Sequence, residues 1–204
     1  MSNLNVNWNL ADASPTAGQT LPQEGDLGYR YAADMPEGTA SEAEKQVLIA
    51  ALVNWMRKAS WFAGSIGQRL KVVRVDTSSS PDGNQKRKTA EVECEVAVEE
   101  DMINAFGTLH GGCSGFLIDV CTTLPLIVLS DEKWGSGGIT QGLNVVFHSP
   151  ALAGSTLQIK SSSVAVGGRS ATARCEIWDK KRQALIASGT NIKMSHTGLA
   201  LNKL

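Results

Sequence analysis

Residues 111–129 read GGCSGFLIDVCTTLPLIVL, and this segment sets the requirements that the rest of the chain must meet. On a helix its apolar side chains fall on nearly every face, which is typical of a helix buried on all sides. Pro125 is expected to end or kink the helix, because proline has no backbone N–H and its ring clashes with the preceding turn. Such a helix needs cover on most sides, and one curved sheet wrapped around it provides that cover.

The chain after the helix is strand-like and supplies most of that sheet. The connections between the strands have hairpin length, and a Gly-Gly turn provides residues that accept positive φ, so neighbouring strands are predicted to be antiparallel. The predicted strands cover residues 139–147, 156–166, 170–178 and 184–194, with connections at 150–154, 167–168 and 179–183.

Two further strands precede the helix. Apolar residues between Leu70 and Val75 indicate the first, and residues 78–84, with Pro and Asp-Gly, indicate a turn after it. Residues 90–98 alternate regularly, which is typical of an antiparallel strand with one buried face. The apolar side of this strand carries Val92, Cys94, Val96 and Val98, and the other side carries Glu91, Glu93 and Glu95.

A leading helix is predicted over residues 41–64. Ser41 and Glu44 have the spacing of a capping box, and apolar residues from Val47 to Met56 recur at helical spacing. Residues 1–40 have no sustained apolar period, which predicts an arm that is disordered or packs on a partner subunit. The expected fold is therefore one α+β domain over residues 41–200, a curved antiparallel sheet around a single long buried helix, with an extra N-terminal helix and arm.

An aromatic group, Trp55, Trp61 and Phe62, lies near the end of the leading helix. Packing in the core or at an interface is the preferred interpretation, and a set that stacks on a ligand is the alternative.

The charge balance argues against several classes of partner. The 204 residues include 19 basic and 20 acidic residues, a net charge of -1, so no attraction to nucleic acid or to an anionic membrane is expected. The four cysteines show neither CxxC pairing nor metal-ligand spacing, so reduced thiols, no metal and an intracellular compartment are predicted. The cytoplasm is the expected location. A peroxisome, suggested by the terminal Asn202-Lys203-Leu204, or a mitochondrion is the alternative.

The start of the central helix has the features of an electrophilic site. His110 is followed by Gly111 and Gly112, which open the helix, and the first amides of a helix have no intrahelical partner. Without Cβ atoms, the two glycines allow a substrate carbonyl to approach those amides, which would stabilise an oxyanion. The alternative is a histidine that only shapes a turn.

Asp119 is the second unusual residue, because a carboxylate within an apolar helix is costly unless it is paired or used in chemistry. It is a candidate general base or nucleophile; the alternative is a carboxylate satisfied by the hydroxyls of Thr122 and Thr123. Asp119 lies eight residues after Gly111, or about 12 Å along the helix axis. One reacting carbonyl would hardly reach both, which predicts a site built between two subunits of a two-fold dimer.

The stretch from Asn104 to Asp119, NAFGTLHGGCSGFLID, together with the stretch from Gly138 to Ala151, GITQGLNVVFHSPA, closely resembles the signature of PaaI-like hotdog thioesterases, a likeness that covers residues 65–195. The resemblance implies hydrolysis of acyl-CoA thioesters, with Asp119 as base or nucleophile and the Gly111 amide polarising the carbonyl. It implies that His110 and Asn104 orient substrate and shape the entry loop and that Thr140 positions water.

The remaining expectations about the site are Gly112, Thr122 and Thr123 as substrate-binding residues and no cofactor, since coenzyme A is part of the substrate. In this family the site lies between the subunits of a homodimer, and such dimers commonly pair into tetramers. Two rival functions stay open: a hotdog dehydratase or hydratase acting on an acyl thioester, and a non-catalytic acyl-CoA-binding module. The sequence does not indicate the length or aromaticity of the acyl group.

Overall fold

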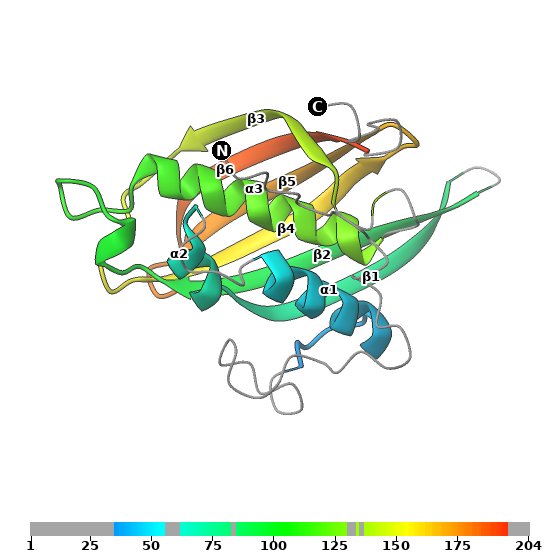
Figure 1. The fold of residues 1–204 in the computed structure, drawn as a ribbon, viewed down its shortest axis with the longest axis horizontal. Helices are drawn as coiled ribbons and strands as arrows, with labels where there is room; N and C mark the ends of the chain where they lie inside the picture. The colour runs from blue at the N-terminus through cyan, green and yellow to red at the C-terminus, as the bar shows by residue number, and fades with distance from the viewer. Residues whose placement is uncertain (1–34, 56–61, 83–84, 130–133, 135–136, 196–204) are drawn as a thin grey trace, which may run out of the picture.

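The computed structural model describes residues 35–55, 62–82, 85–129, 134 and 137–195, and contains one curved antiparallel sheet with helices on one face (Figure 1). The helices are α1 (Glu42–Trp55), α2 (Gly64–Arg69) and α3 (Gly111–Val128), with a short 3-10 helix at Glu100–Met102. The strands are β1 (Lys71–Asp82), β2 (Gln85–Ala97), β3 (Ile139–Phe147), β4 (Thr156–Val166), β5 (Ser170–Asp179) and β6 (Ala184–Met194). This arrangement confirms the predicted α+β class.

The six strands are ordered β1-β2-β4-β5-β6-β3, so β1 and β3 are the two edges. All five pairings are antiparallel, as the hairpin-length connections predict. The four strands after the central helix agree with their predicted ranges to within one residue. The alternation in β2 is also confirmed, because Val92, Cys94, Val96 and, just beyond the strand, Val98 are buried.

The central helix α3 lies along the inner face of the sheet and packs against β2, β3, β4, β5 and β6 (Figure 1). Its length and composition would allow it to cross a membrane, but 67% of it is buried inside the fold. This burial is typical of the core helix of a globular domain.

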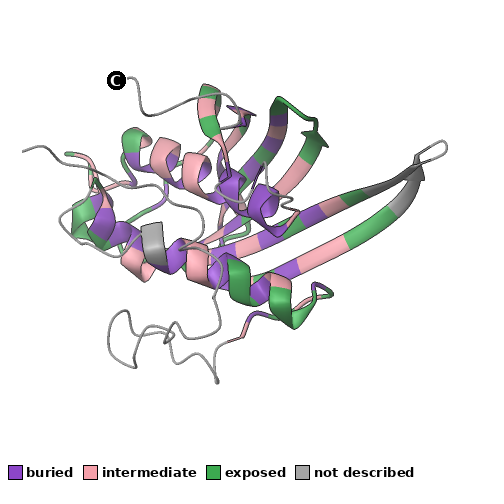
Figure 2. Cartoon of the chain, turned by 45° about the vertical axis from the view of Figure 1, so that its right-hand side comes forward, coloured by how far each residue is buried: buried purple, intermediate pink, exposed green. Residues whose placement is uncertain are grey.

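Burial of α3 is uneven along its length (Figure 2). The second half, residues 121–128, is buried on all sides, as predicted. The first half keeps a partly accessible strip, which we call the open stripe and which consists of Gly112, Gly115, Phe116, Asp119 and Val120. Their spacing of three or four residues places these five positions on one side of the helix.

Pro125 does not end the helix, contrary to one part of the prediction. The helix continues to Val128, and Leu129 is its C-cap. The missing N–H of Pro125 removes one hydrogen bond, but the segment around it is completely buried in the core. We attribute the continuation to this packing, because tertiary contacts commonly outweigh local helix preference.

The leading helix differs from the prediction of a single helix over residues 41–64. Ser41 and Glu44 do form the capping box, since the Ser41 amide donates to the Glu44 carboxylate at 2.8 Å. However, the described part of α1 ends at Trp55, and residues 56–61 lie outside the described residues. Gly64 begins α2 instead of ending a helix. The buried side of α1 carries Leu48, Ile49, Leu52 and Val53, whereas Val47 is 39% exposed.

Part of the predicted arm is ordered against the sheet. Residues 1–34 lie outside the described residues, but residues 35–40 run beside β1. The Glu37 amide donates to the Val73 carbonyl at 2.9 Å, and the Val75 amide donates to the Glu37 carbonyl at 2.8 Å. Gly38 has a φ of 107°, and a Cβ there would lie 2.2 Å from the Val75 carbonyl oxygen, so only glycine fits this close approach.

The turn predicted over residues 78–84 is shorter than expected. The ladder between β1 and β2 continues to the pair Asp82 and Gln85, so most of the polar stretch is strand. The two strands form a long hairpin that projects beyond the rest of the sheet (Figure 1). Backbone pairing with a neighbouring strand outweighed the local preference of Ser, Pro and Asp for turns.

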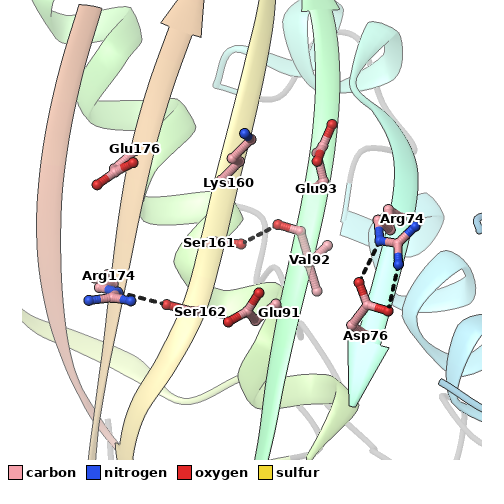
Figure 3. Close-up of a pocket in the computed structure, with 10 residues that line it drawn as sticks. All are labelled: Arg74, Asp76, Glu91, Val92, Glu93, Lys160, Ser161, Ser162, Arg174 and Glu176. Atoms are coloured by element: carbon pink, nitrogen blue, oxygen red, sulfur yellow. Dashed lines mark hydrogen bonds and ion pairs between the residues drawn. The ribbon is translucent and has the colours of Figure 1, made fainter. Parts of the chain in front are cut away.

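The outer face of the sheet, on the side away from α3, is charged (Figure 3). Cross-strand neighbours place Arg74 beside Glu93, Glu93 beside Lys160, and Lys160 beside Glu176. A depression of about 350 Å³ on this face is lined by charged and polar residues. Opposite charges across neighbouring strands stabilise a solvated sheet face, so we interpret this surface as structural.

Candidate active site

The N-terminus of α3 is capped by the side chain that precedes it. His110 is the N-cap residue, and its Nδ1 accepts a hydrogen bond from the Gly112 amide at 2.9 Å. The Gly111 amide donates to no group within the described part of the chain. His110 therefore satisfies the second amide of the helix and leaves the first amide available to a ligand.

A close contact explains part of the composition at this end of α3. A Cβ on Gly111 would lie 3.3 Å from the ring of Phe147, which comes from the end of β3. Phe147 is 60% exposed, so an apolar surface lies beside the free amide. Gly112 was predicted to bind substrate; its amide is already engaged by His110, and a Cβ at this exposed position would lie 3.1 Å from the His110 ring.

The loop before the helix is organised by Asn104. Its Oδ1 accepts from the Phe106 amide at 2.9 Å and from the Thr108 amide at 3.3 Å, and Gly107 adopts a φ of 72° within the turn. The loop is tied to the body of the protein because the His110 amide donates to the Met102 carbonyl at 2.8 Å. Asn104 shapes the entry to the helix and does not itself contact Asp119.

Asp119 lies on the open stripe and receives three hydrogen bonds on one oxygen. Its Oδ1 accepts from Thr140 Oγ1 at 2.6 Å, from Asn191 Nδ2 at 2.8 Å and from Lys193 Nζ at 3.2 Å. Its Oδ2 has no partner among the described residues, and the side chain is 43% exposed. The carboxylate is thus held by one oxygen while the other remains available for chemistry.

The surroundings keep Asp119 ionised. Burial by itself raises the pKa of Asp119, but the hydrogen bond from Thr140, the charge of Lys193 and the hydrogen bond from Asn191 together lower that pKa below its ordinary value. Burial lowers the pKa of Lys193, and the nearby Asp119 carboxylate opposes that change. An ionised carboxylate is the form required of a general base or a nucleophile.

Two neighbouring strands, β3 and β6, position the partners of Asp119. Thr140 on β3 lies directly opposite Lys193 on β6, and a register shift follows between Thr140 and Gly142. This bulge allows both Thr140 and Leu143 to face α3, although they are three positions apart and would face opposite sides of a regular strand. Gly142 lies on the other face of β3, away from Asp119.

Asn191 and Lys193 were missed in the sequence. Both are buried, with 0% and 3% of their surfaces exposed, and both follow Ala187 and Gly189 at alternate positions of β6. The signal was present: in residues 184–194 the polar Asn191 and Lys193 share the core-facing side, whereas Ile192 is outward and 46% exposed. Such inverted alternation marks a strand with a polar function on its inner face.

Thr122 and Thr123 require a correction. Both are buried, and their hydroxyls donate to main-chain carbonyls of the preceding turn, Thr123 to the Asp119 carbonyl at 2.8 Å. The described structure therefore places neither hydroxyl on the accessible side of the helix, contrary to the prediction that they bind substrate. Thr122 also accepts from Asn191 at 2.9 Å, so it supports the site from behind.

A cysteine near the helix start is a poor rival to Asp119 as the nucleophile. Cys113 lies in the first turn of α3, where a helix dipole ordinarily favours a thiolate. Burial instead raises the pKa of the Cys113 thiol to about 11. Its thiol remains protonated at neutral pH.

No group of three or more His, Cys, Asp or Glu side chains in the described ranges is arranged to hold a metal ion. The aromatic group predicted near the end of the leading helix is only partly described. Trp61 and the side chain of Trp55 lie outside the described residues. Phe62 is 86% exposed and makes an edge contact with Phe116, at 5.8 Å between ring centroids, so it does not belong to the core of this chain.

Comparisons with known proteins identify the family of the chain. The model of the thioesterase superfamily matches residues 106–186. Acyl-coenzyme A thioesterase 13 of Homo sapiens is 35% identical over 102 residues, which are 50% of this chain and 71% of the human protein. The Mus musculus protein of the same name is 33% identical over 100 residues, 49% of this chain and 69% of the mouse protein.

A solved structure extends the likeness to the fold. The crystal structure of zebrafish thioesterase superfamily member 2 superposes with a TM-score of 0.55 at 26% identity, covering 73% of this chain and 93% of that chain. The curved sheet around one central helix is the hotdog fold of thioesterases, and the relatives place the chain among thioester hydrolases. The chain belongs to the thioesterase superfamily, as the resemblance of residues 104–119 predicted.

Proposed function

We propose that this protein hydrolyses acyl-CoA thioesters to a free acid and coenzyme A. The observation that carries the proposal is the state of Asp119, an ionised carboxylate with one oxygen held by three donors and the other oxygen free. Asp119 lies on the open stripe of α3, and at the start of the same helix the Gly111 amide has no partner among the described residues. The names of the human and mouse relatives indicate the same substrate class.

In the proposed reaction the thioester carbonyl oxygen accepts a hydrogen bond from the Gly111 amide, which stabilises negative charge on that oxygen as the carbonyl carbon is attacked. Asp119 acts through Oδ2, either by taking a proton from the attacking water or by attacking the carbon itself. The C–S bond then breaks and the coenzyme A sulfur receives a proton. When water attacks, the acid is released directly. When Asp119 attacks, water then hydrolyses the anhydride between Asp119 and the acyl group, which releases the acid and restores the carboxylate. Both routes require an ionised Asp119.

A second copy of the chain completes the site in this proposal. Gly111 and Asp119 lie on one continuous helix and are separated by about 12 Å along its axis, which is too far for one carbonyl to reach both. A two-fold axis would bring the helix start of one subunit to Asp119 of the other.

The edge of the sheet at β3 supports this assembly. An unpaired edge strand with apolar side chains is a ready surface for pairing with another strand. Along β3, Leu143 is 38% exposed, Val146 48% and Phe147 60%. Antiparallel pairing of β3 with its copy would continue the sheet and cover these side chains. We also propose that the reaction needs no cofactor, since coenzyme A is part of the substrate.

The test is an assay of free thiol released from a panel of acyl-CoAs, comparing the wild-type protein with Asp119→Asn and Glu91→Gln. Asp119→Asn should lower kcat/KM by about two orders of magnitude or more, because the amide is neither a base nor a nucleophile. Glu91→Gln makes the same chemical change at an exposed position on the outer face of the sheet and should leave the activity unchanged.

The rival functions give other results in the same experiment. Loss of the β-hydroxyl from a 3-hydroxyacyl-CoA without thiol release would establish a dehydratase and contradict the proposal. Saturable binding of acyl-CoA with neither reaction would establish a binding module. Unchanged thiol release in a folded Asp119→Asn protein would remove Asp119 from the mechanism.

A further inference from the structure

Lys193 is a buried cation that the hydrolytic reaction described above does not use. Its side chain is 4% exposed, and it faces α3 from β6. Burying an ammonium group costs several kcal/mol unless the charge is paired and its hydrogen bonds are satisfied. A lysine kept at such a position therefore calls for a specific role.

The contacts of Lys193 go to two members of the proposed site. Its Nζ lies 3.2 Å from Asp119 Oδ1 and 2.8 Å from Thr140 Oγ1. In the described chain no other carboxylate pairs with Lys193.

The direction of these hydrogen bonds follows from the chemistry of the groups. An ammonium group has donors and no acceptor, so Thr140 Oγ1 must accept from Lys193. The Thr140 proton is then directed to the Asp119 Oδ1, which lies 2.6 Å away. The Thr140 hydroxyl is therefore committed to Asp119 and does not donate to water or substrate.

Asn191 completes the same arrangement from the next inward position of β6. Its Nδ2 donates to Asp119 Oδ1 at 2.8 Å, while its own Oδ1 is buried without a hydrogen-bond partner in the described residues. A carboxylate only accepts, so the amide must present its nitrogen to Asp119. The unsatisfied Oδ1 is the cost of that orientation.

Resting on the proposed function, we propose that Lys193 is a positioning residue of the hydrolytic site. Its ammonium group holds Asp119 through Oδ1, directs the Thr140 hydroxyl toward the same oxygen, and keeps the carboxylate charged with Oδ2 free. Among the described residues, Lys193 from β6 is the charged group that contacts the Asp119 carboxylate, and the other two contacts, Thr140 from β3 and Asn191 from β6, are neutral.

The sign of the expected pH effect follows from this arrangement. The carboxylate is present above its pKa and is lost as the pH falls through that pKa. With Lys193 in place the pKa of Asp119 lies below the ordinary value of 3.8, so the acid limb of kcat/KM lies there too. Without the Lys193 charge, less opposes the increase in the Asp119 pKa that burial causes. The acid limb of kcat/KM should therefore move to higher pH by about one to three pH units.

The experiment compares the wild-type protein with Lys193→Met, Lys193→Gln and the control Lys160→Met. Two readouts are taken: the pH profile of kcat/KM with a thiol-releasing acyl-CoA, and the titration of the Asp119 carboxyl carbon by ¹³C NMR. Lys193→Met should raise the pKa of Asp119 and move the acid limb of kcat/KM to higher pH. It should also lower kcat by about ten-fold or more. Lys193→Gln removes the charge but keeps a donor, so it should shift the acid limb with a smaller loss of kcat.

Lys160→Met removes an exposed lysine of the outer sheet face and should change neither readout. An Asp119 pKa that is the same in the wild-type protein and in folded Lys193→Met would overturn the proposal. If the Lys193 variants do not fold, the wild-type titration decides. An Asp119 pKa at or above 3.8 in the wild-type protein, or a neutral Lys193 amine at pH 7 by ¹⁵N NMR, overturns the proposal. An Asp119 pKa below 3.8 together with a charged Lys193 supports the proposal.

The carboxyl titration does not depend on turnover. If the wild-type protein releases no thiol from any acyl-CoA, the proposed function fails, but the titration still answers whether Lys193 controls Asp119. The two failures are therefore distinguishable.

Discussion

Asp119 is partly buried, and burial alone disfavours a charged carboxylate. Three donors on Oδ1 reverse that tendency, so the same residue is both desolvated and ionised. His110 plays a comparable part at the helix start, where its Nδ1 occupies the Gly112 amide. At both places a side chain satisfies one polar atom of the site and leaves its neighbour free for a ligand.

The role of the Gly111 amide can be tested with a single substitution. Gly111 is the first residue of α3, a position where proline is well tolerated, and His110 already has the extended ψ of 135° that a residue before proline requires. Gly111→Pro removes the amide hydrogen and should lower kcat by about 100-fold while the helix remains. Gly111→Ala is the control, because it adds a Cβ against Phe147 but keeps the amide.

Circular dichroism and thermal unfolding should show both Gly111 variants folded. Equal activity of Gly111→Pro and Gly111→Ala would mean that this amide does not polarise the substrate.

At the scale of elements, the distance between α3 and β6 decides whether Asp119 reaches its partners. Gly189 on β6 lies against Ile118, the residue before Asp119, and a Cβ at Gly189 would lie 2.8 Å from Ile118 Cγ2 and 2.8 Å from the Asn144 carbonyl oxygen. The bulge in β3 then turns Thr140 toward the same point. Close approach of the helix and the bulge in the strand together assemble the donors around Asp119.

Gly189→Ala should therefore both destabilise the protein and impair the site. Overpacking of this kind costs about 1–3 kcal/mol, measured as the free energy of unfolding in urea, and the displaced helix should reduce kcat/KM. Gly115→Ala is the control for stability, because a Cβ there meets nothing within 4 Å. If Gly189→Ala equals wild type in stability and activity, the close approach is not required.

At the scale of the whole molecule, the two proposed half-sites at Gly111 and Asp119 are separated, and no described segment pairs with the free side of β3 at the edge of the sheet. In the proposed dimer a second copy would cover, or share with substrate, three surfaces: the open stripe of α3, the exposed ring of Phe62 and the apolar side chains of β3. The charged outer face of the sheet contrasts with them, since its opposite charges already neighbour one another across the strands (Figure 3).

Mixing two inactive proteins tests whether the site lies between subunits. Each mixed dimer of Asp119→Asn and Gly111→Pro would contain one intact site, formed by Gly111 of the first chain and Asp119 of the second. After unfolding and refolding together in equal amounts, about a quarter of the wild-type activity should return. Light scattering should give a dimer or a pair of dimers. A monomer, or no recovery of activity in dimers of mixed composition, contradicts a shared site.

The local sequence pattern was sufficient to predict most helices and strands and the part of the site that lies around His110 and Asp119. The all-round apolar helix, the alternation of β2 and the hairpin-length connections each report a property of neighbouring residues, and the motif around His110 and Asp119 is contiguous. Errors arose where a distant contact outweighed a local preference: Pro125 lies within a helix buried by the sheet, and the polar end of β1 is held by pairing with β2.

The donors from β6 that hold the Asp119 carboxylate could be identified only from the tertiary structure. Asn191 and Lys193 lie more than 70 residues after Asp119 and carry no motif, so their pairing with it required the curvature of the sheet and the closeness of α3 to Gly189. By itself, the sequence determined that a helix start and a carboxylate share one apolar helix. The fold determined which oxygen of that carboxylate is held and which is free, because this depends on side chains that only the closed sheet brings together.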